Sequence, residues 1–429
     1  MRALVAVLAF LVCAVVDAGA FRRFNKNAEG PVLASPGSPP PPASAVFEML
    51  TAGEPTVPGT VTFTRASESY CPGGAEDEAG EWLTTDEPCV NDLGLKMEGS
   101  RTNVLLHSAA TLTGTGWSVA NGLVSSNADT APDGSTDADR FIPSSEAVEH
   151  RTLRQDVPYV PGTTYTATVY AASATVPWIG IQIFDDALGA CAFNISTGTA
   201  GSCAGPHSSS ASVIETVVVG GLTYHRLAMT FTAQSSANAY FLFKATKTEA
   251  SALGSTGEAF NSSDYVTLWG GQVEAGAYAT SYIRTSGTAV TRAAEVASIS
   301  TPVAVTDSTG CAFAAIYARG PTSGQRLFGF GATNRLALGS STTASFFDSA
   351  NTTTATALSS IARRAVEAVA SWTGATASVS LDGESNSGTY DGAFLGGTIY
   401  LGSDGSGNHL NGYLRNVRID DTTNGCTPP

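Results

Sequence analysis

The sequence predicts an all-β protein made of two consecutive antiparallel β-sandwiches. Short runs of alternating apolar and polar residues recur between turn residues along most of the chain, which is the strand period. Charged residues make up only 14% of the 429 residues, and glycine occurs 45 times. Few stretches carry a long helical pattern, so the composition favours sandwiches over alternating strands and helices.

Residues 1–20 predict a secretory signal peptide. One arginine precedes a short apolar run that ends in Ala18-Gly19-Ala20, a small-residue cleavage pattern. The run is too short to span a membrane, and no other segment is long and apolar enough to do so. We therefore expect a secreted, extracellular protein with no membrane span.

The next two segments predict little regular structure. Residues 21–45 contain four successive prolines, which favour an extended, semi-rigid linker. Residues 46–107 contain few strand patterns and are expected to form an irregular N-terminal arm without a core of its own. The net charge is −15 and no block of lysine or arginine occurs, so nucleic acid is a poor partner.

Residues 108–288 predict the first sandwich, through runs such as TTYTATVYAAS, WIGIQIF, TYHRLAMTFTA and YVTLWGGQVE. Residues 289–429 predict the second, through CAFAAIYAR, ATASVSLDGES and GYLRNVRID. One passage, SSIARRAVEAVASW, is rich in helix formers. We expect a strand there because Val366, Ala368, Ala370 and Trp372 alternate with other residues.

The stretch Asp264–Arg292 carries a resemblance to a known family. Its phrases LWGGQVE, TSYIRT and AVTRAAEVASI resemble the end of a jelly-roll domain of bacteriophage tail and fibre proteins. That domain is similar in build to carbohydrate-binding modules and is often followed by a concanavalin A/laminin G-like domain. The phrases TFTRAS and GLKMEGSRTN further upstream resemble the leader that precedes such a jelly roll.

The resemblance extends to the second sandwich, where VSLDGE and then TIYLGSDGSGNHLNGYLRNVRI resemble the concanavalin A/laminin G class. It implies a secreted, non-catalytic protein that binds carbohydrate or another surface polymer. A structural or adhesion protein that uses its sandwiches for protein contacts, or for homo-oligomers, is the alternative. A polysaccharide-degrading enzyme is a third class, but the chain has neither an E-x-D-x-x-E motif nor an HExxH motif, so no catalytic residue is expected.

Six cysteines follow the signal peptide: Cys71, Cys89, Cys191, Cys203, Cys311 and Cys426. An even count in a secreted chain predicts disulfides, with 15 possible pairings. The expected domain boundaries favour 71–89, 191–203 and 311–426. In the concanavalin A/laminin G pattern the first and last strands lie close together, which implies about 4.4–6.8 Å between the Cα atoms of the last pair.

Aromatic side chains that could stack on a sugar ring are the candidate ligand-binding residues, namely Trp117, Trp178, Tyr240 and Tyr413. Core packing is the alternative for each of them. Binding to a neutral sugar by stacking would be weak and insensitive to salt.

Two further kinds of site are expected from short patterns. A structural calcium ion, the one cofactor considered, would take its oxygen ligands from four aspartates of one loop: Asp129, Asp133, Asp137 and Asp139. In a eukaryotic host, three sequons would accept glycans, at Asn194, Asn261 and Asn351.

Overall fold

The computed structural model describes residues 60–426 apart from 74–77, 92, 109–115, 146–151, 208, 237–238, 255–256, 301–308, 320–323, 331–333, 349–350, 358, 392–397, 406 and 421–425. The expected signal peptide and Pro-rich linker lie outside the described residues. The described part confirms the all-β fold, with two six-stranded and two seven-stranded antiparallel sheets. It contains no helix long and apolar enough to cross a membrane.

The first sandwich consists of the two six-stranded sheets. In sheet order, the strands of one sheet are β14 (Thr199–Ala204), β13 (Leu188–Asn194), β12 (Trp178–Phe184), β17 (Tyr240–Thr246), β10 (Thr152–Asp156) and β7 (Ser118–Ala120). Those of the other are β15 (Ser210–Val219), β16 (Leu222–Thr232), β11 (Thr164–Ser173), β18 (Val266–Ala275), β9 (Ala138–Pro143) and β8 (Gly122–Asp129). Alternate residues such as Ile181 and Phe243, which pair across β12 and β17, supply the core between them.

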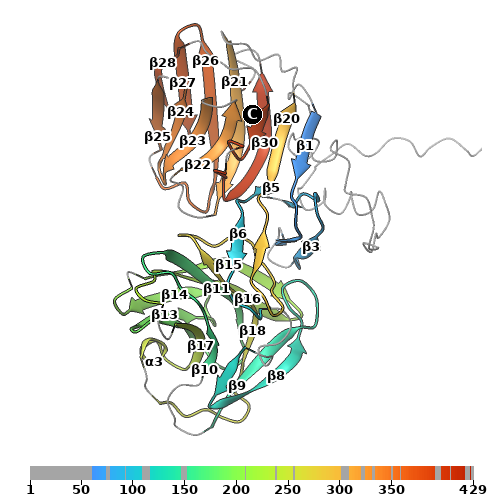
Figure 1. Ribbon diagram of the computed structural model, residues 1–429, viewed down its shortest axis with the longest axis vertical. Helices are drawn as coiled ribbons and strands as arrows, with labels where there is room; N and C mark the ends of the chain where they lie inside the picture. The colour runs from blue at the N-terminus through green and yellow to red at the C-terminus, as the bar shows by residue number, and fades with distance from the viewer. Residues whose placement is uncertain are drawn as a thin grey trace, which may run out of the picture. The chain divides into compact units, whose positions relative to one another are not determined.

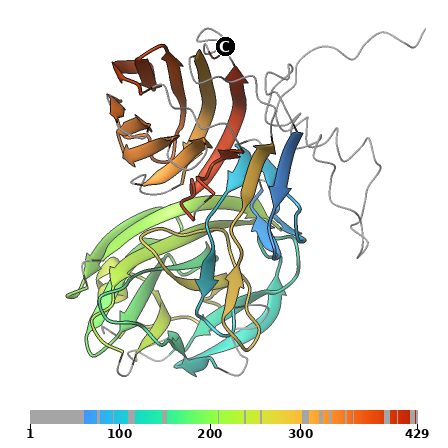
Figure 2. The ribbon, with the colours of Figure 1, turned by 45° about the horizontal axis from the view of Figure 1, so that its top comes forward.

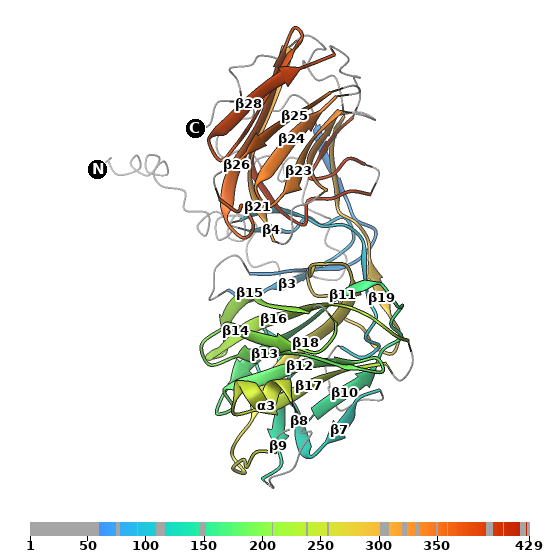
Figure 3. The same ribbon diagram turned by 90° about the vertical axis from the view of Figure 1, so that its left-hand side faces the viewer.

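A short helix, α3 (Glu249–Leu253), covers part of the β12–β17 face (Figure 3). Its N-cap Thr248 accepts a hydrogen bond from the Ser251 amide at 3.3 Å. Gln182 and Lys244, which project from the sheet, donate hydrogen bonds to backbone carbonyls of the helix. These bonds fix the helix on the sheet.

The second sandwich consists of the two seven-stranded sheets (Figure 1). In sheet order, the strands of one are β1 (Thr60–Thr64), β20 (Val296–Ser300), β29 (Ile399–Leu401), β22 (Gln325–Phe330), β23 (Asn334–Ser340), β24 (Thr343–Phe347) and β25 (Thr352–Thr356). Those of the other are β28 (Glu384–Thr389), β27 (Thr376–Leu381), β26 (Ala365–Thr373), β21 (Thr309–Ala318), β30 (Gly412–Asp420), β5 (Gly94–Met97) and β4 (Val90–Asn91).

The described part of the N-terminal arm, residues 60–107, corrects the expected domain map, because it contributes strands to the second sandwich. Strand β1 pairs with β20, and Figure 2 shows this blue strand beside the golden one. Strand β5 pairs with β30 in the facing sheet. Val61, Phe63, Leu95 and Met97 of the arm are buried in the core of the second sandwich. The arm therefore covers sheet edges and apolar surface that residues 289–429 alone would expose.

Two small ladders complete the arm. Strand β2 (Ser69–Cys71) pairs with β3 (Glu81–Leu83), and β6 (Arg101–Asn103) pairs with β19 (Val290–Arg292). The second ladder joins the end of the arm to the segment between the two sandwiches. Within that segment, Thr280, Ser281, Tyr282 and Ile283 are buried.

Strand β26 confirms the expectation for the passage rich in helix formers. Its even-numbered residues from Val366 to Trp372 are buried, and the residues between them are half-buried. Pairing with β21 on one side and β27 on the other satisfies its backbone.

The three expected disulfides are confirmed. The Cα–Cα distances are 5.3 Å for Cys71–Cys89 and 4.1 Å for Cys191–Cys203. The Cys311–Cys426 distance is 5.9 Å, inside the expected range. Cys311 lies in β21, which pairs with the last strand, β30, and this pairing brings the C-terminal cysteine close.

Candidate functional site

The outer face of the β15–β16–β11 sheet carries a row of hydroxyl side chains. Antiparallel register places Ser210 opposite Thr230, and Thr230 opposite Thr166. Because side chains alternate between the two faces of a sheet, these three point away from the core. The Oγ1 atoms of Thr166 and Thr230 are 3.0 Å apart. Together the three strands present a polar surface.

This surface forms one wall of a hollow of about 200 Å³, which we call the polar pocket. Two arginines of the second sandwich, Arg319 and Arg363, also line it. The pocket is lined by Thr166, Ser210, Ser212, Ile214, Ala228, Thr230, Ala277, Tyr278, Ala279, Arg319 and Arg363. The pocket lining thus combines hydroxyl side chains with two arginines around a small space.

Arg363 is exposed at the rim of the polar pocket. Its backbone has a positive φ of 59°, and its amide donates to the carbonyl of Ala318 at 2.8 Å. The guanidinium reaches the first sandwich, where Nη1 donates to the Val213 carbonyl at 2.9 Å and Nη2 to the Ser212 Oγ at 3.0 Å. The arginine therefore spans the pocket mouth.

Arg319 lies deeper and is only 10% exposed. Its Nη2 donates to Glu215 Oε2 at 3.1 Å, and its Nη1 lies 3.5 Å from Glu98 Oε1. Burial alone would lower the pKa of Arg319, but Tyr413 and the two carboxylates outweigh it and raise the pKa above its ordinary value. This guanidinium is held firmly in its charged form.

Tyr278 is the aromatic residue of the pocket lining, and the sequence reasoning missed it. It follows the LWGGQVE strand directly, in a loop of alanines, and is half-buried. The guanidinium of Arg101 lies over its ring, 5.0 Å from the centroid. The signal that could have identified it is an aromatic residue in a loop at the end of the motif strand.

A buried ionic network lies behind Arg319. Lys96 uses its three N–H donors on Ser69 Oγ, the Tyr70 carbonyl and Ser281 Oγ, at 2.8–3.1 Å. Its Nζ lies 3.4 Å from Glu295 and 3.6 Å from Glu98. Burial lowers the pKa of Lys96, although both carboxylates oppose that shift.

Two more arginines complete this network. Arg65 Nη1 lies 3.3 Å from Glu295 Oε1, and Arg292 Nη2 lies 3.4 Å from Glu98 Oε2. Burial would raise the pKa of Glu98, but Lys96, Arg292 and Arg319 together hold it well below its ordinary value. Hydrogen bonds from the Ser281 amide and hydroxyl support the same carboxylate.

The phrases that carried the family resemblance are therefore structural. Arg65 comes from TFTRAS, Lys96 and Glu98 from GLKMEG, and Arg292 and Glu295 from AVTRAAE. The fold brings these distant segments together between the arm and the second sandwich. These residues form the buried network next to Arg319. Among the described residues of this network, only Arg319 also lines the polar pocket.

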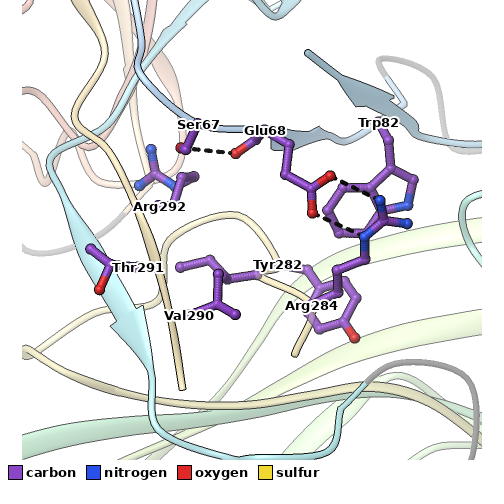
Figure 4. Close-up of a pocket in the computed structure, with 9 residues that line it drawn as sticks. Ser67, Glu68, Trp82, Tyr282, Arg284, Val290, Thr291 and Arg292 are labelled. Atoms are coloured by element: carbon purple, nitrogen blue, oxygen red, sulfur yellow. Dashed lines mark hydrogen bonds and ion pairs between the residues drawn. The ribbon is translucent and has the colours of Figure 1, made fainter. Parts of the chain in front are cut away.

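A second, much smaller hollow of about 20 Å³ lies beside Trp82 (Figure 4). Arg284 makes a paired contact with the Glu68 carboxylate, at 3.0 and 2.8 Å, and lies 4.3 Å from the Trp82 ring centroid. The edge of Tyr282 faces Trp82 at 5.7 Å. A space of this size holds a single water molecule, so this hollow is a packing feature of the arm.

Two of the four expected stacking residues lie in the interior. Trp117 is 8% exposed, stacks on Phe243 and donates from Nε1 to the His107 carbonyl at 2.6 Å. Tyr413 is 1% exposed, with Arg319 at 5.8 Å from its ring centroid, and burial raises its pKa to about 12. Tyr413 supports the polar pocket from behind but offers no face to a ligand.

The other two lie on the outer face of the β12–β17 sheet. Tyr240 has Phe184 stacked on one side at 5.0 Å and the Arg154 guanidinium on the other at 3.7 Å, so both faces of its ring are covered. Trp178 is half-buried, with its indole against Gly201 of β14. The fold brings none of the four into the polar pocket.

The four aspartates expected to bind calcium each have their own partners. Asp129 binds Arg140 and Thr267, Asp133 binds Trp82, Asp137 binds Trp269, and Asp139 accepts from the Asn127 amide. Among the described residues no three carboxylate, histidine or cysteine side chains are grouped as a metal would require. Calcium at this loop stays a prediction.

The three sequons differ in accessibility. Asn261 is exposed, whereas Asn194 and Asn351 are half-buried. The Asn194 side-chain oxygen accepts from the Ser196 amide at 3.1 Å, and Asn351 donates to Asp348 at 3.2 Å. Asn261 is thus the most accessible acceptor of the three.

Comparisons with known proteins find similarity among solved structures alone. No family model matches the chain, and no curated protein matches it. Among solved structures the chain is similar to mouse laminin alpha1 chain, domains LG4-5, with 9% identity and a TM-score of 0.23. The match covers 76% of this chain and 89% of that one. The likeness to phage tail proteins stays a prediction.

Proposed function

We propose that this chain is a secreted, non-catalytic binding protein and that the polar pocket holds part of a glycan. The observation that carries the proposal is a hollow of about 200 Å³ that is lined by a row of serine and threonine residues and by two arginines. Hydroxyl side chains both donate and accept, so they can exchange hydrogen bonds with the hydroxyls of a sugar. Ligand pockets commonly span roughly 300–1,000 Å³, so this pocket suits one sugar unit of a longer chain.

The pocket chemistry supports binding without catalysis. Glycoside hydrolysis generally needs two carboxyl groups that flank the scissile bond. The residues that line the polar pocket include no aspartate or glutamate. The three disulfides support secretion, because disulfides persist in oxidising compartments.

A glycan array probed with the purified protein tests the proposal. Ser212→Trp fills the pocket from its half-buried rim and should abolish the signals that the unchanged protein gives. Ser385→Trp, on the exposed outer strand β28, is the matched control and should leave them intact.

An array without signals, or signals that survive Ser212→Trp, would contradict glycan binding in this pocket. Capture of a protein partner in place of glycans would favour the adhesion alternative. Release of reducing ends from a bound polysaccharide would overturn the non-catalytic part of the proposal.

A further inference from the structure

We infer that the polar pocket selects saccharides that carry an acidic group, a carboxylate or a sulfate, and holds this group between Arg319 and Arg363. The inference rests on the proposed function and names the class of glycan. Both arginines line the pocket, and the Arg363 Nε lies 3.4 Å from the Arg319 carbonyl oxygen.

The first argument is an unsatisfied donor. Arg319 is nine-tenths buried, and its Nη1 has no hydrogen-bond partner, although Glu98 lies at ion-pair distance. A buried N–H without a partner costs free energy that a suitable acceptor would recover. Arg319 thus keeps part of its positive charge without a hydrogen-bond partner, in a residue that lines the pocket.

The second argument is the charge balance behind the pocket. The buried network holds five cations, Arg65, Lys96, Arg226, Arg292 and Arg319, against three carboxylates, Glu98, Glu215 and Glu295. Adding the neighbouring Arg101–Glu274 pair gives six against four, so the excess stays at two positive charges. The chain as a whole carries −15, so this local excess is opposite in sign to the rest. Buried excess charge is costly unless an ion of opposite sign is nearby.

The third argument is the geometry of Arg363. A guanidinium has five N–H donors in a planar fork. Three of these donors in Arg363 bind the Arg319 carbonyl, the Val213 carbonyl and Ser212. One N–H therefore remains on each terminal nitrogen. Such a fork binds a carboxylate or sulfate at the exposed rim, with Arg319 below it. Ser210 and Thr230 then face the hydroxyls of the same sugar unit.

Calorimetric titration of the full secreted protein tests the inference with three probes. They are trigalacturonic acid, its fully methyl-esterified form, and a sulfated heparin-derived tetrasaccharide. We expect the acid to bind and its neutral ester to bind at least about tenfold more weakly, since hydrogen bonds to charged groups contribute more than neutral ones. The sulfated probe decides between carboxylate and sulfate as the preferred acidic group.

Arg363→Gln should weaken binding of the preferred acidic probe about tenfold or more, and Arg363→Lys should restore part of the loss. Arg364→Gln is the matched control, because its side chain turns to Asp382 and Ser360 and does not line the pocket. Binding of the acid should also weaken as ionic strength rises, in contrast to the salt-insensitive binding expected for a neutral sugar.

Equal binding of the acid and its methyl ester, or full binding by Arg363→Gln, would overturn the acidic preference and leave glycan binding standing. If none of the three probes binds and the array gives signals for neutral glycans only, the acidic preference is likewise overturned and glycan binding still stands. An array that is empty as well would overturn both this inference and the proposed function.

Discussion

Two buried glutamates show how surroundings decide the state of a carboxyl group. Glu98 faces Lys96, Arg292 and Arg319, and its pKa is lowered even though burial opposes that shift. Glu274 is equally buried, with Arg101 3.9 Å away, and burial raises its pKa although Arg226 and Arg101 oppose that shift. The cations around Glu98 therefore stabilise its charged form, whereas burial disfavours the charged form of Glu274.

Substitution by glutamine should reduce stability to different extents at Glu98 and Glu274. Glu98→Gln removes an anion from among three cations and should destabilise the protein by roughly 3–5 kcal/mol, as for a broken buried ion pair. Glu274→Gln keeps an acceptor for Gln272 and for the Thr280 amide, and should cost less than about 1 kcal/mol. Urea unfolding at neutral pH measures both, and equal losses would show that the network is not what stabilises this region.

Acid should weaken the protein through Glu98. Its folded pKa lies below the ordinary value of 4.5, so the folded state binds fewer protons than the unfolded state. The stabilisation is complete above pH of about 4.5 and is lost as pH falls toward the folded pKa. Unfolding free energies measured from pH 6 to pH 3 should fall steeply for the unchanged protein and less steeply for Glu98→Gln. Parallel curves would refute this assignment.

At the scale of elements, strand β26 shows tertiary context overriding helix propensity. Alanine, arginine and glutamate favour a helix locally, but the alternation of buried residues fits two sheet neighbours. Ala370→Asp places a charge in the core and should cost several kcal/mol. Ala365→Asp, at the exposed start of the strand, should change stability by about 0.5 kcal/mol or less. Thermal unfolding of the two variants checks this, and similar losses would contradict the strand register.

The disulfides should differ in how much each contributes to the free energy of unfolding, because they close loops of different length. Cys311 and Cys426 are 115 residues apart, whereas Cys191 and Cys203 are 12 apart. On the chain-entropy model the long loop contributes about 4–5 kcal/mol and the short one about 3. Denaturant unfolding of the two double-serine variants tests the order, and a larger loss for the short loop would show that strain or unfolded-state structure dominates.

At the scale of the whole molecule, the second sandwich is assembled from two separate parts of the chain. Strands β1, β4 and β5 precede the first sandwich, and the remaining strands follow it. A fragment of residues 289–429 lacks these three strands and the four core residues that the arm supplies. We expect this fragment to unfold without cooperativity or to aggregate, whereas residues 46–429 should unfold cooperatively. Circular dichroism of both proteins decides, and a stable 289–429 fragment would contradict the discontinuous domain.

The sequence by itself determined the features that depend on neighbouring residues. Alternation marked strands such as β26, and the even cysteine count with the domain boundaries led to the three disulfides. The tertiary structure alone decided which distant segments meet. Arg65, Lys96 and Glu295 lie far apart in the chain and look like ordinary charged residues, yet they form one buried network. The polar pocket likewise needs Arg363 and Ser212 from different sandwiches, because local periodicity shows which side chains share a face but not which faces come together.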